Sequence, residues 1–235
     1  MQIPSQLIKA TCVESTNGIA AQTPSAVTGA ASRTMEREDW NKRYASEEFI
    51  WTANANRFLM AETADLSPGS ALDLATGEGR NAVWLAEQGW TVRAVDFSDV
   101  AIGKAKRLAT VRNVIDEIDF CEEDLRRYEP EFHRFDLVAL IYLQIPQADL
   151  LPILSRAARA VAPGGTFLLV GHDTENLING YGGPQSADML YTAQQGVAAL
   201  GNEIVIEKAG RVERPVQTQD GIKVAIDCLV RGKRL

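Results

Sequence analysis

Residues 71–81 of this 235-residue chain read ALDLATGEGRN, an apolar run that carries one aspartate and leads into a Gly-x-Gly turn. Apolar residues at helical spacing follow the turn as far as Gly89. This order of strand, glycine turn and helix is typical of a nucleotide site, because glycine lets backbone approach a ligand and the first N–H groups of the helix face it. Seventeen residues after Gly79, a second apolar run ends at Asp96, where a carboxylate commonly binds ribose hydroxyls.

Two classes of cofactor fit this turn. The spacing Gly77-x-Gly79-x-x-Ala82 also matches the dinucleotide fingerprint of NAD(P)-binding oxidoreductases. Asp73, at the end of the first predicted strand, favours a different cofactor. A carboxylate there is awkward beside a pyrophosphate and suits a positively charged ammonium or sulfonium group. The sequence therefore favours a cationic ligand and keeps the NAD(P) class as the alternative.

Composition limits the classes of partner. The hydrophobic content of 46% and charged content of 23% are ordinary for one soluble globular domain. The net charge of −7 disfavours a nucleic-acid surface, and no apolar stretch approaches the roughly 20 residues of a membrane span. Two histidines are too few for a multi-histidine metal site. Cys12, Cys121 and Cys228 have no metal-binding spacing, which predicts reduced thiols and a cytoplasmic location.

The chain divides into two predicted regions. Residues 1–34 are rich in Ser, Thr, Ala, Gln and Gly, and they show little apolar periodicity. We therefore expect a disordered N-terminal tail over 1–34 and a single domain over 35–235.

Predicted strands and helices alternate after the glycine turn. Strands are expected at 91–95, 118–121, 135–141 and 166–170, and helices at 54–66, 99–109, 147–161 and 191–200. Segments 203–208 and 223–230 are expected to pair as a hairpin through the turn signal at 217–221. The prediction is an α/β fold with a Rossmann-like, seven-stranded, mostly parallel sheet, a C-terminal antiparallel hairpin and helices on both faces.

Five side chains that can bind a ligand or take part in catalysis lie at the carboxyl ends of predicted parallel strands, where such sheets bind ligands. They are Asp73, Asp96, Asp124, Tyr142 and His172.

The stretch ALDLATGEGRN and the later VDFS closely resemble the first two motifs of class I S-adenosylmethionine-dependent methyltransferases. The Trp-x-x-Arg-Tyr pattern at 40–44, with Phe49 and Trp51 behind it, resembles the N-terminal segment of bacterial tellurite and thiopurine methyltransferases, which folds over the cofactor. The open alternative is that these aromatic residues form only a hydrophobic cap. A terminal hairpin is typical of the class, whereas dehydrogenase domains lack it. The resemblance covers about 36–235 and is strongest over 70–170.

This resemblance implies S-adenosylmethionine as the cofactor and implies which residues contact it. Asp96 would bind the ribose hydroxyls, Phe97 would pack along the adenine, and Asp124 with the Leu125 backbone would meet the adenine edge. A slip of one residue at Asp124 stays open, because two glutamates precede it. The full implied set is Trp40, Asp73, Ala75, Gly77, Gly79, Asn81, Asp96, Phe97, Asp124, Leu125 and Tyr142.

Candidate residues for the acceptor side lie later in the chain. His172 is the candidate general base, because its unperturbed pKa is about 6.5 and it follows a strand, and Asp173 would orient it or bind substrate. The alternative is a loop histidine bonded to backbone. A base is needed only where the acceptor atom carries a proton. The candidate substrate residues are Gln144, Tyr181, Tyr191 and Arg214.

The sequence thus predicts methyl transfer to a small-molecule acceptor, with S-adenosylhomocysteine as by-product and the methylated atom (O, N or S/Se/Te) left open. No metal, nucleic acid or membrane partner is expected, and the protein is expected to be a monomer or homodimer. The alternatives are an NAD(P)-binding oxidoreductase and a non-catalytic S-adenosylmethionine-binding protein.

Overall fold

A computed structural model describes residues 35–46, 48–50 and 52–235. The predicted tail, residues 1–34, lies outside the described residues, as does Trp51. The domain boundary after residue 34 stays a prediction.

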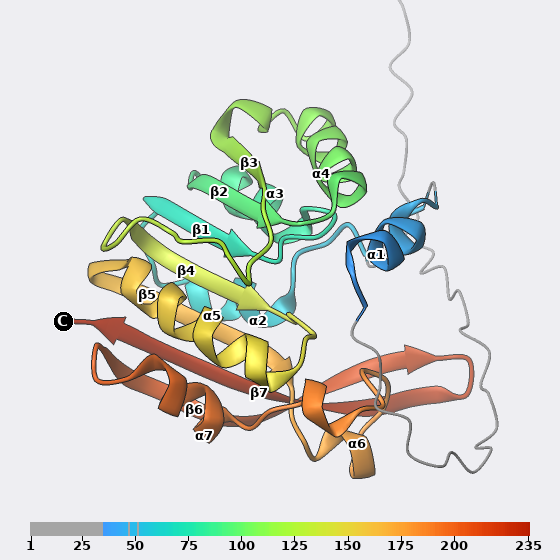
Figure 1. Ribbon diagram of the computed structural model, residues 1–235. Helices are drawn as coiled ribbons and strands as arrows, with labels where there is room; N and C mark the ends of the chain where they lie inside the picture. The colour runs from blue at the N-terminus through green and yellow to red at the C-terminus, as the bar shows by residue number, and fades with distance from the viewer. Residues whose placement is uncertain (1–34, 47, 51) are drawn as a thin grey trace, which may run out of the picture.

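The elements alternate along the chain much as the sequence indicates (Figure 1). In chain order they are α1 (Arg37–Tyr44), α2 (Arg57–Thr63), β1 (Ser70–Leu74), α3 (Arg80–Glu87), β2 (Thr91–Asp96), α4 (Asp99–Val111), a 3₁₀ turn (Ile115–Glu117), β3 (Ile118–Glu122), β4 (Phe135–Ile141), α5 (Gln147–Ala160), β5 (Val161–His172), α6 (Asn176–Asn179), a second 3₁₀ turn (Ala187–Met189), α7 (Ala193–Leu200), β6 (Ile204–Thr218) and β7 (Gly221–Arg234).

The strands form one seven-stranded sheet in the order β3-β2-β1-β4-β5-β7-β6. Strands β1 to β5 pair in parallel, and β7 pairs antiparallel with both β5 and β6. The predicted fold class, including its antiparallel C-terminal hairpin, is confirmed.

The hairpin is longer than predicted. β6 has 15 residues, whereas the sequence indicated a strand over 203–208 only. Its second half is paired with β7 alone and projects beyond the other strands (Figure 1). One face of this half is only half-buried and includes polar residues such as Arg214, so it leaves little apolar signal in the sequence.

Helices cover both faces of the sheet. On one face α5 and α7 pack against alternate strand residues such as Leu72, Val138 and Leu169. On the other face α2, α3 and α4 pack against the intervening residues, among them Ala71 and Ala139. Figure 1 shows α5 and α7 on the near side, with α2 and α3 behind the sheet. β4 is buried on both sides, which explains its nearly unbroken apolar sequence.

Capping residues set where two helices begin. The Ser98 hydroxyl accepts the Ala101 N–H at 3.1 Å and starts α4 as predicted. The Asn56 side chain accepts the Phe58 N–H at 2.9 Å, so α2 begins at Arg57 rather than at residue 54.

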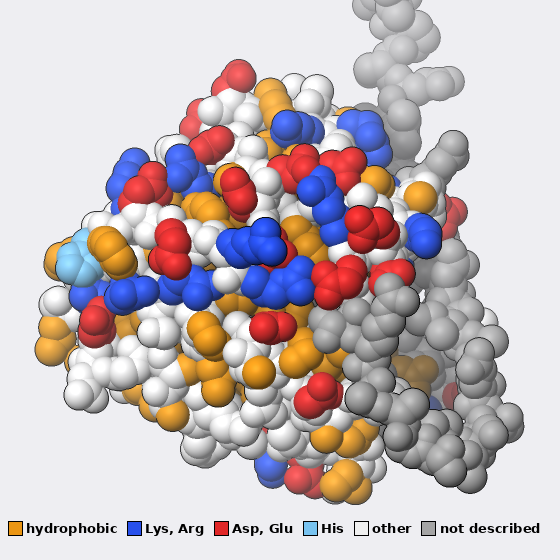
Figure 2. Space-filling model, viewed as in Figure 1, with side chains coloured by type: hydrophobic (Ala, Val, Ile, Leu, Met, Phe, Trp, Pro, Cys, Tyr) orange, Lys and Arg blue, Asp and Glu red, His pale blue; other side chains and the backbone are white. Residues whose placement is uncertain are grey.

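None of the helices in the described residues is long and apolar enough to cross a membrane. On the face drawn in Figure 2, acidic and basic side chains lie interspersed rather than separated by sign.

Candidate functional site

A pocket opens at the carboxyl ends of the parallel strands, between the glycine turn, the segment after β4, and α1. Ten of the predicted site residues line it: Trp40, Ala75, Gly77, Asn81, Asp96, Phe97, Asp124, Leu125, Tyr142 and Gln144. The strand ends therefore bring together residues that are up to about a hundred positions apart in the sequence.

The two glycines of the turn have different roles. Gly77 has a φ of 56°, and a Cβ built there would lie 3.2 Å from the Tyr44 hydroxyl oxygen, so its place at the pocket surface requires a bare backbone. Gly79 has a φ of 83°, and a Cβ there would lie 2.5 Å from the Cβ of Ala105 in α4. Gly79 therefore serves close helix packing. Gly79 is not among the residues that line the pocket, and contact between its backbone and a cofactor stays a prediction.

Asp96 joins the first two strand ends. Its Oδ2 accepts the Gly77 N–H at 2.9 Å and its Oδ1 accepts the Ser98 N–H at 2.9 Å. The side chain is 7% exposed, and burial raises the pKa of its carboxyl. Each carboxylate oxygen has a second lone pair, so the group can still accept hydroxyl hydrogens from a ligand.

Asp73 lies beneath the turn rather than on the pocket surface. Its carboxyl is 1% exposed and accepts the Thr76 hydroxyl at 2.6 Å. Burial raises the pKa of Asp73 to about 7, and the nearby charge of Asp96 adds to this effect. Asp73 is not among the residues that line the pocket, so we expect it to act on a cation there through its charge.

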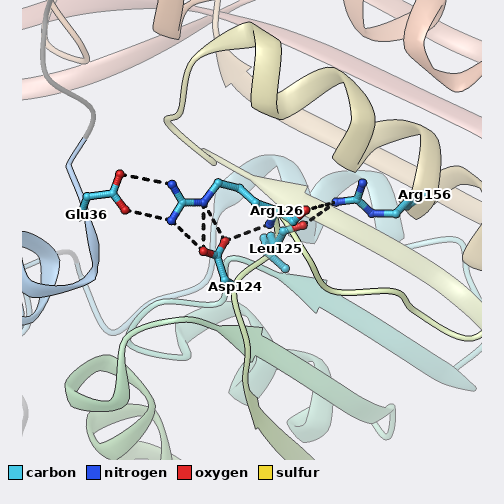
Figure 3. Close-up of polar contacts among 5 residues, drawn as sticks. All are labelled: Glu36, Asp124, Leu125, Arg126 and Arg156. Carbon is cyan, nitrogen blue, oxygen red and sulfur yellow. Dashed lines mark hydrogen bonds and ion pairs between the residues drawn. The ribbon is translucent and has the colours of Figure 1, made fainter.

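The loop after β3 is held in place by two arginines, which Figure 3 shows. Arg126 donates to both carboxylate oxygens of Asp124 and to both oxygens of Glu36, just before α1. This contact lowers the pKa of Asp124. Arg156 donates to the Leu125 carbonyl at 2.7 Å. Arg126 lines the pocket and was missed in the sequence, because its partner Glu36 is 90 residues away.

Polar contacts hold α1 over the strand ends. Asn41 donates to Asp99 at 2.7 Å and accepts the Ser98 hydroxyl at 2.6 Å. On the pocket side, the Trp40 and Tyr44 rings stack with centroids 5.5 Å apart. The predicted N-terminal aromatic segment therefore lies at the pocket.

The segment after α1 is held by a buried ion pair. Lys104 of α4 lies 2.8 Å from Glu78 of the glycine turn, and both side chains are 3% exposed. Glu78 also accepts the Ile50 N–H at 3.0 Å, and Lys104 donates to the Glu48 carbonyl at 2.6 Å. The pair thus connects the glycine turn to the chain that covers it.

The far side of the pocket is built around Tyr142, directly after β4. Its φ of 61° is unusual for a residue with a side chain. The Tyr142 hydroxyl donates to Asp227 Oδ2 at 2.6 Å, and Arg214 Nε donates to the same carboxylate oxygen at 2.8 Å. Asp227 is fully buried, and although burial raises its pKa, His172, Arg214 and Tyr142 together hold that pKa below its usual value.

His172 lies behind Tyr142, outside the residues that line the pocket. It is 8% exposed, and its ring lies 4.9 Å from the Tyr142 ring and against Gly183. His172 Nδ1 is 2.9 Å from Asp227 Oδ1. The imidazole is therefore bonded within the structure and set back from the pocket lining, and its role as a general base stays a prediction.

Asp173 was predicted to orient His172 or to bind substrate; in the structure it is bonded to Arg211 instead, and a role in substrate binding stays a prediction. Asp173 is 1% exposed and accepts Arg211 Nε at 2.8 Å. The acid beside the imidazole is Asp227, which lies directly opposite His172 in the β5–β7 pairing. This cross-strand register is not visible in local sequence.

Three predicted substrate residues lie outside the pocket lining. Tyr191 is 2% exposed, and its hydroxyl lies against Gly171 in the core. Tyr181 is 44% exposed on the loop after α6. Arg214 contacts the pocket only through Tyr142, whose hydroxyl accepts its Nε–H at 2.9 Å.

Within the described part of the chain, no group of three or more His, Cys, Asp or Glu side chains gathers as a metal site. Arg80 and Asp149 do line the pocket and were not among the predicted site residues.

Part of the chain is similar in sequence to known methyltransferases. Residues 71–165 match a family model described as a methyltransferase domain. A relative described as uncharacterized methyltransferase sll0829, from Synechocystis sp., is 34% identical over 119 residues, which are 48% of this chain and 51% of the relative. The chain thus spans about half the length of that relative.

Two solved structures resemble the fold. N-methyltransferase NodS from Bradyrhizobium japonicum in complex with S-adenosyl-L-homocysteine has a TM-score of 0.64 at 15% identity, over 84% of this chain and 97% of NodS. TehB from Haemophilus influenzae has a TM-score of 0.63 at 14% identity, over 85% of this chain and 67% of TehB. At these identities the likeness concerns the fold.

The residues that match the family model include the ends of β1 and β2, the Asp124 loop and the start of β5. The remaining strands complete the same seven-stranded sheet. Residues 71–165 are therefore similar to a methyltransferase domain, and the fold around them resembles those of solved methyltransferases.

Proposed function

We propose that the protein transfers a methyl group from S-adenosylmethionine to a small-molecule acceptor and releases S-adenosylhomocysteine. One observation carries this proposal: the glycine turn, Asp96, Phe97, Leu125 and Tyr142 all line a single pocket at the strand ends. The methyltransferase family match and the relatives' printed activities support it.

The residues present fit the adenosine part of this cofactor. The bare backbone at Gly77 leaves room for a ligand where a Cβ would crowd the Tyr44 hydroxyl. The Asp96 carboxylate can accept ribose hydroxyls, and Phe97 offers an aromatic surface to the base. Asp124 is held at the adenine end by Arg126.

When bound, the cofactor supplies an activated methyl group on a sulfonium. The protein then has to align the acceptor atom with the methyl–sulfur axis and to exclude water. Tyr142 is suited to align the acceptor, because Asp227 and Arg214 fix its hydroxyl. The segment with Trp40 and Tyr44 is suited to exclude water, since it lies over the strand ends.

The NAD(P) alternative is disfavoured by the sheet. Dinucleotide-binding sheets commonly continue in parallel to the sixth strand in the order 3-2-1-4-5-6. Here the antiparallel β7 lies between β5 and β6.

The proposal also covers the location of the protein, its oligomeric state and the atom that is methylated. The cysteine pattern favours a cytoplasmic location. Monomer and homodimer are the oligomeric states proposed. The methylated atom is O, N or one of S, Se and Te.

The test is a screen for S-adenosylhomocysteine release with phenols, thiols, heterocyclic amines and oxyanions as acceptors. The full chain should release S-adenosylhomocysteine with at least one class, and Gly77→Val should abolish release because Cβ fills the turn. Tight S-adenosylmethionine binding without turnover on any class would support the non-catalytic binding protein instead.

A further inference from the structure

One charged side chain of the pocket has no partner. Arg80, the first residue of α3, lines the pocket and is half-buried. Its guanidinium forms no hydrogen bond and no ion pair with any residue that the structure describes, whereas the neighbouring pocket charges Glu78 and Asp124 are paired with Lys104 and Arg126.

This position is unfavourable for a cation. The amino end of a helix carries a partial positive charge, so an arginine there is repelled rather than stabilised. Burial lowers the pKa of Arg80, yet an arginine side chain remains charged in proteins. A half-buried guanidinium without a protein partner is incompletely solvated, and an anionic ligand in the pocket would stabilise it.

Two acids act on Arg80 through their charge, and both are bonded elsewhere. The Asp73 carboxyl accepts the Thr76 hydroxyl, and Glu78 is paired with Lys104. Burial raises the pKa of Asp73 to about 7, so near neutral pH it carries only part of a negative charge. The positive charge at the start of α3 therefore has little compensation.

The surroundings indicate on which side of the pocket Arg80 acts. Arg80 and Tyr142 both line the pocket, and Tyr142 and Arg214 are among the groups close enough to act on the Arg80 pKa. Tyr142 and Arg214 belong to the side of the pocket away from Asp96 and Asp124. Arg214 is bonded to Asp227 and lies outside the pocket lining, so of these two arginines it is Arg80 that can reach a ligand in the pocket.

We propose that Arg80 binds a carboxylate, or an oxyanion of similar shape, in the pocket beside Tyr142. The planar fork of an arginine is suited to two parallel hydrogen bonds with such a group. Resting on the proposed function, the inference allows two sources for the anion, namely a carboxylate of the acceptor and the amino-acid carboxylate of the cofactor.

The first arm of the test uses calorimetry on the full chain with two cofactor products. S-adenosylhomocysteine carries the amino-acid carboxylate, and 5′-methylthioadenosine lacks it. If the cofactor is the source, Arg80→Gln should weaken S-adenosylhomocysteine roughly 10- to 100-fold and leave 5′-methylthioadenosine unchanged, while Arg80→Lys falls between. Arg112→Gln, which removes an exposed arginine paired with Glu87, is the control.

The second arm uses protein saturated with S-adenosylhomocysteine, titrated with 4-hydroxybenzoate, formate and 4-hydroxybenzamide. If the acceptor is the source, wild type should bind an acid at least about tenfold more tightly than the amide, and Arg80→Gln should remove that preference. In both cases the melting temperature of unliganded Arg80→Gln should equal or exceed that of wild type, because an unpaired half-buried charge is removed.

The outcomes are separable. Unchanged S-adenosylhomocysteine affinity in Arg80→Gln, together with no preference of wild type for an acid over the amide, would overturn the anion site while leaving the proposed function intact. A lower melting temperature of Arg80→Gln without ligand would show a structural role and also contradict the inference. Wild type that binds neither S-adenosylhomocysteine nor 5′-methylthioadenosine would overturn the proposed function, and this inference with it.

Discussion

The two sides of the pocket are built in different ways. We call the part of the pocket around Gly77, Asp96, Phe97 and Asp124 the adenosine side, and the part around Tyr142 the acceptor side, after their proposed roles. On the adenosine side, the Gly77–Asp96 hydrogen bond joins residues 19 positions apart. On the acceptor side, the Tyr142 hydroxyl contacts Asp227 and Arg214, which are 85 and 72 positions away. The first side depends on consecutive strand–turn–helix units, and the second depends on how the C-terminal hairpin pairs with β5.

This difference separates what the two sides do. In the proposed function, the adenosine side presents the Gly77 backbone and the Asp96 carboxylate to a cofactor of fixed shape. The acceptor side is a network that fixes Tyr142 and leaves Arg80 unpaired, and changes in the hairpin can reshape it without disturbing the adenosine side. Variants on the two sides should therefore affect different measurements.

The largest effect is expected on the acceptor side. Asp227→Ala removes a fully buried carboxylate and leaves Arg214, His172 and the Tyr142 hydroxyl without their shared partner. We expect the free energy of unfolding to fall by roughly 3–5 kcal/mol, measured by urea denaturation.

The matched control is Asp119→Ala, because its carboxylate is paired with Arg93 but is 63% exposed. It should cost at most about 1 kcal/mol. Equal effects of the two variants would contradict the view that the buried network holds the acceptor side together.

On the adenosine side, Asp96→Ala should act on cofactor binding. Loss of charge-assisted hydrogen bonds to the ribose should weaken S-adenosylhomocysteine binding by about 1.5–3 kcal/mol in calorimetry. Asp116→Ala, which changes an exposed aspartate outside the pocket lining, is the control and should bind as wild type does. If both variants bind alike, the ribose is not held at Asp96.

A pH dependence should also arise on the adenosine side. The pKa of Asp73 is raised from its usual 3.8 to about 7 in the folded protein. A bound sulfonium favours the ionised carboxyl, so S-adenosylmethionine affinity should rise as pH increases towards 7, by at most about tenfold per pH unit, and level off above it. Asp73→Asn should flatten this dependence in calorimetry at pH 5.5 to 8.5.

The same pKa shift has the opposite sign for stability. Between about pH 4 and 7 the folded state binds more protons than the unfolded state, so this group lowers the free energy of unfolding as pH rises. Asp73→Asn should remove that decline. An unchanged pH slope in the variant would mean that another group titrates there.

The smallest effect is expected where α1 meets the adenosine side. Arg126 bridges Asp124 and Glu36, but the three side chains are 30–43% exposed. Arg126→Gln should therefore weaken cofactor binding only about two- to fivefold at low salt, and the difference should vanish near 1 M salt. A loss that persists at high salt would show that Arg126 contacts the ligand directly.

The same contrast explains what the sequence could predict. The glycine turn, the Ser98 cap and the apolar run of β4 are local patterns, and the predicted elements there agree with the structure. His172 was placed correctly at a strand end, but not behind Tyr142, because the positive φ of Tyr142 and the His172–Asp227 register depend on contacts between distant strands. Asp227 gave no local signal, since it lies inside an ordinary alternating strand.

Arg126 and the second half of β6 were missed for related reasons. An arginine in a loop is usually solvated, and its role appears only when Glu36 is brought beside it. One face of that half of β6 is only half-buried and includes polar residues such as Arg214, so it imposes little apolar alternation.

The central claim is that this pocket binds S-adenosylmethionine and its product rather than a dinucleotide. Calorimetric titration of the full chain with S-adenosylhomocysteine and, separately, with NADH tests it most directly. We predict saturable binding of S-adenosylhomocysteine at one site per chain, lost in Gly77→Val, and no binding of NADH. Saturable NADH binding without S-adenosylhomocysteine binding would contradict the account.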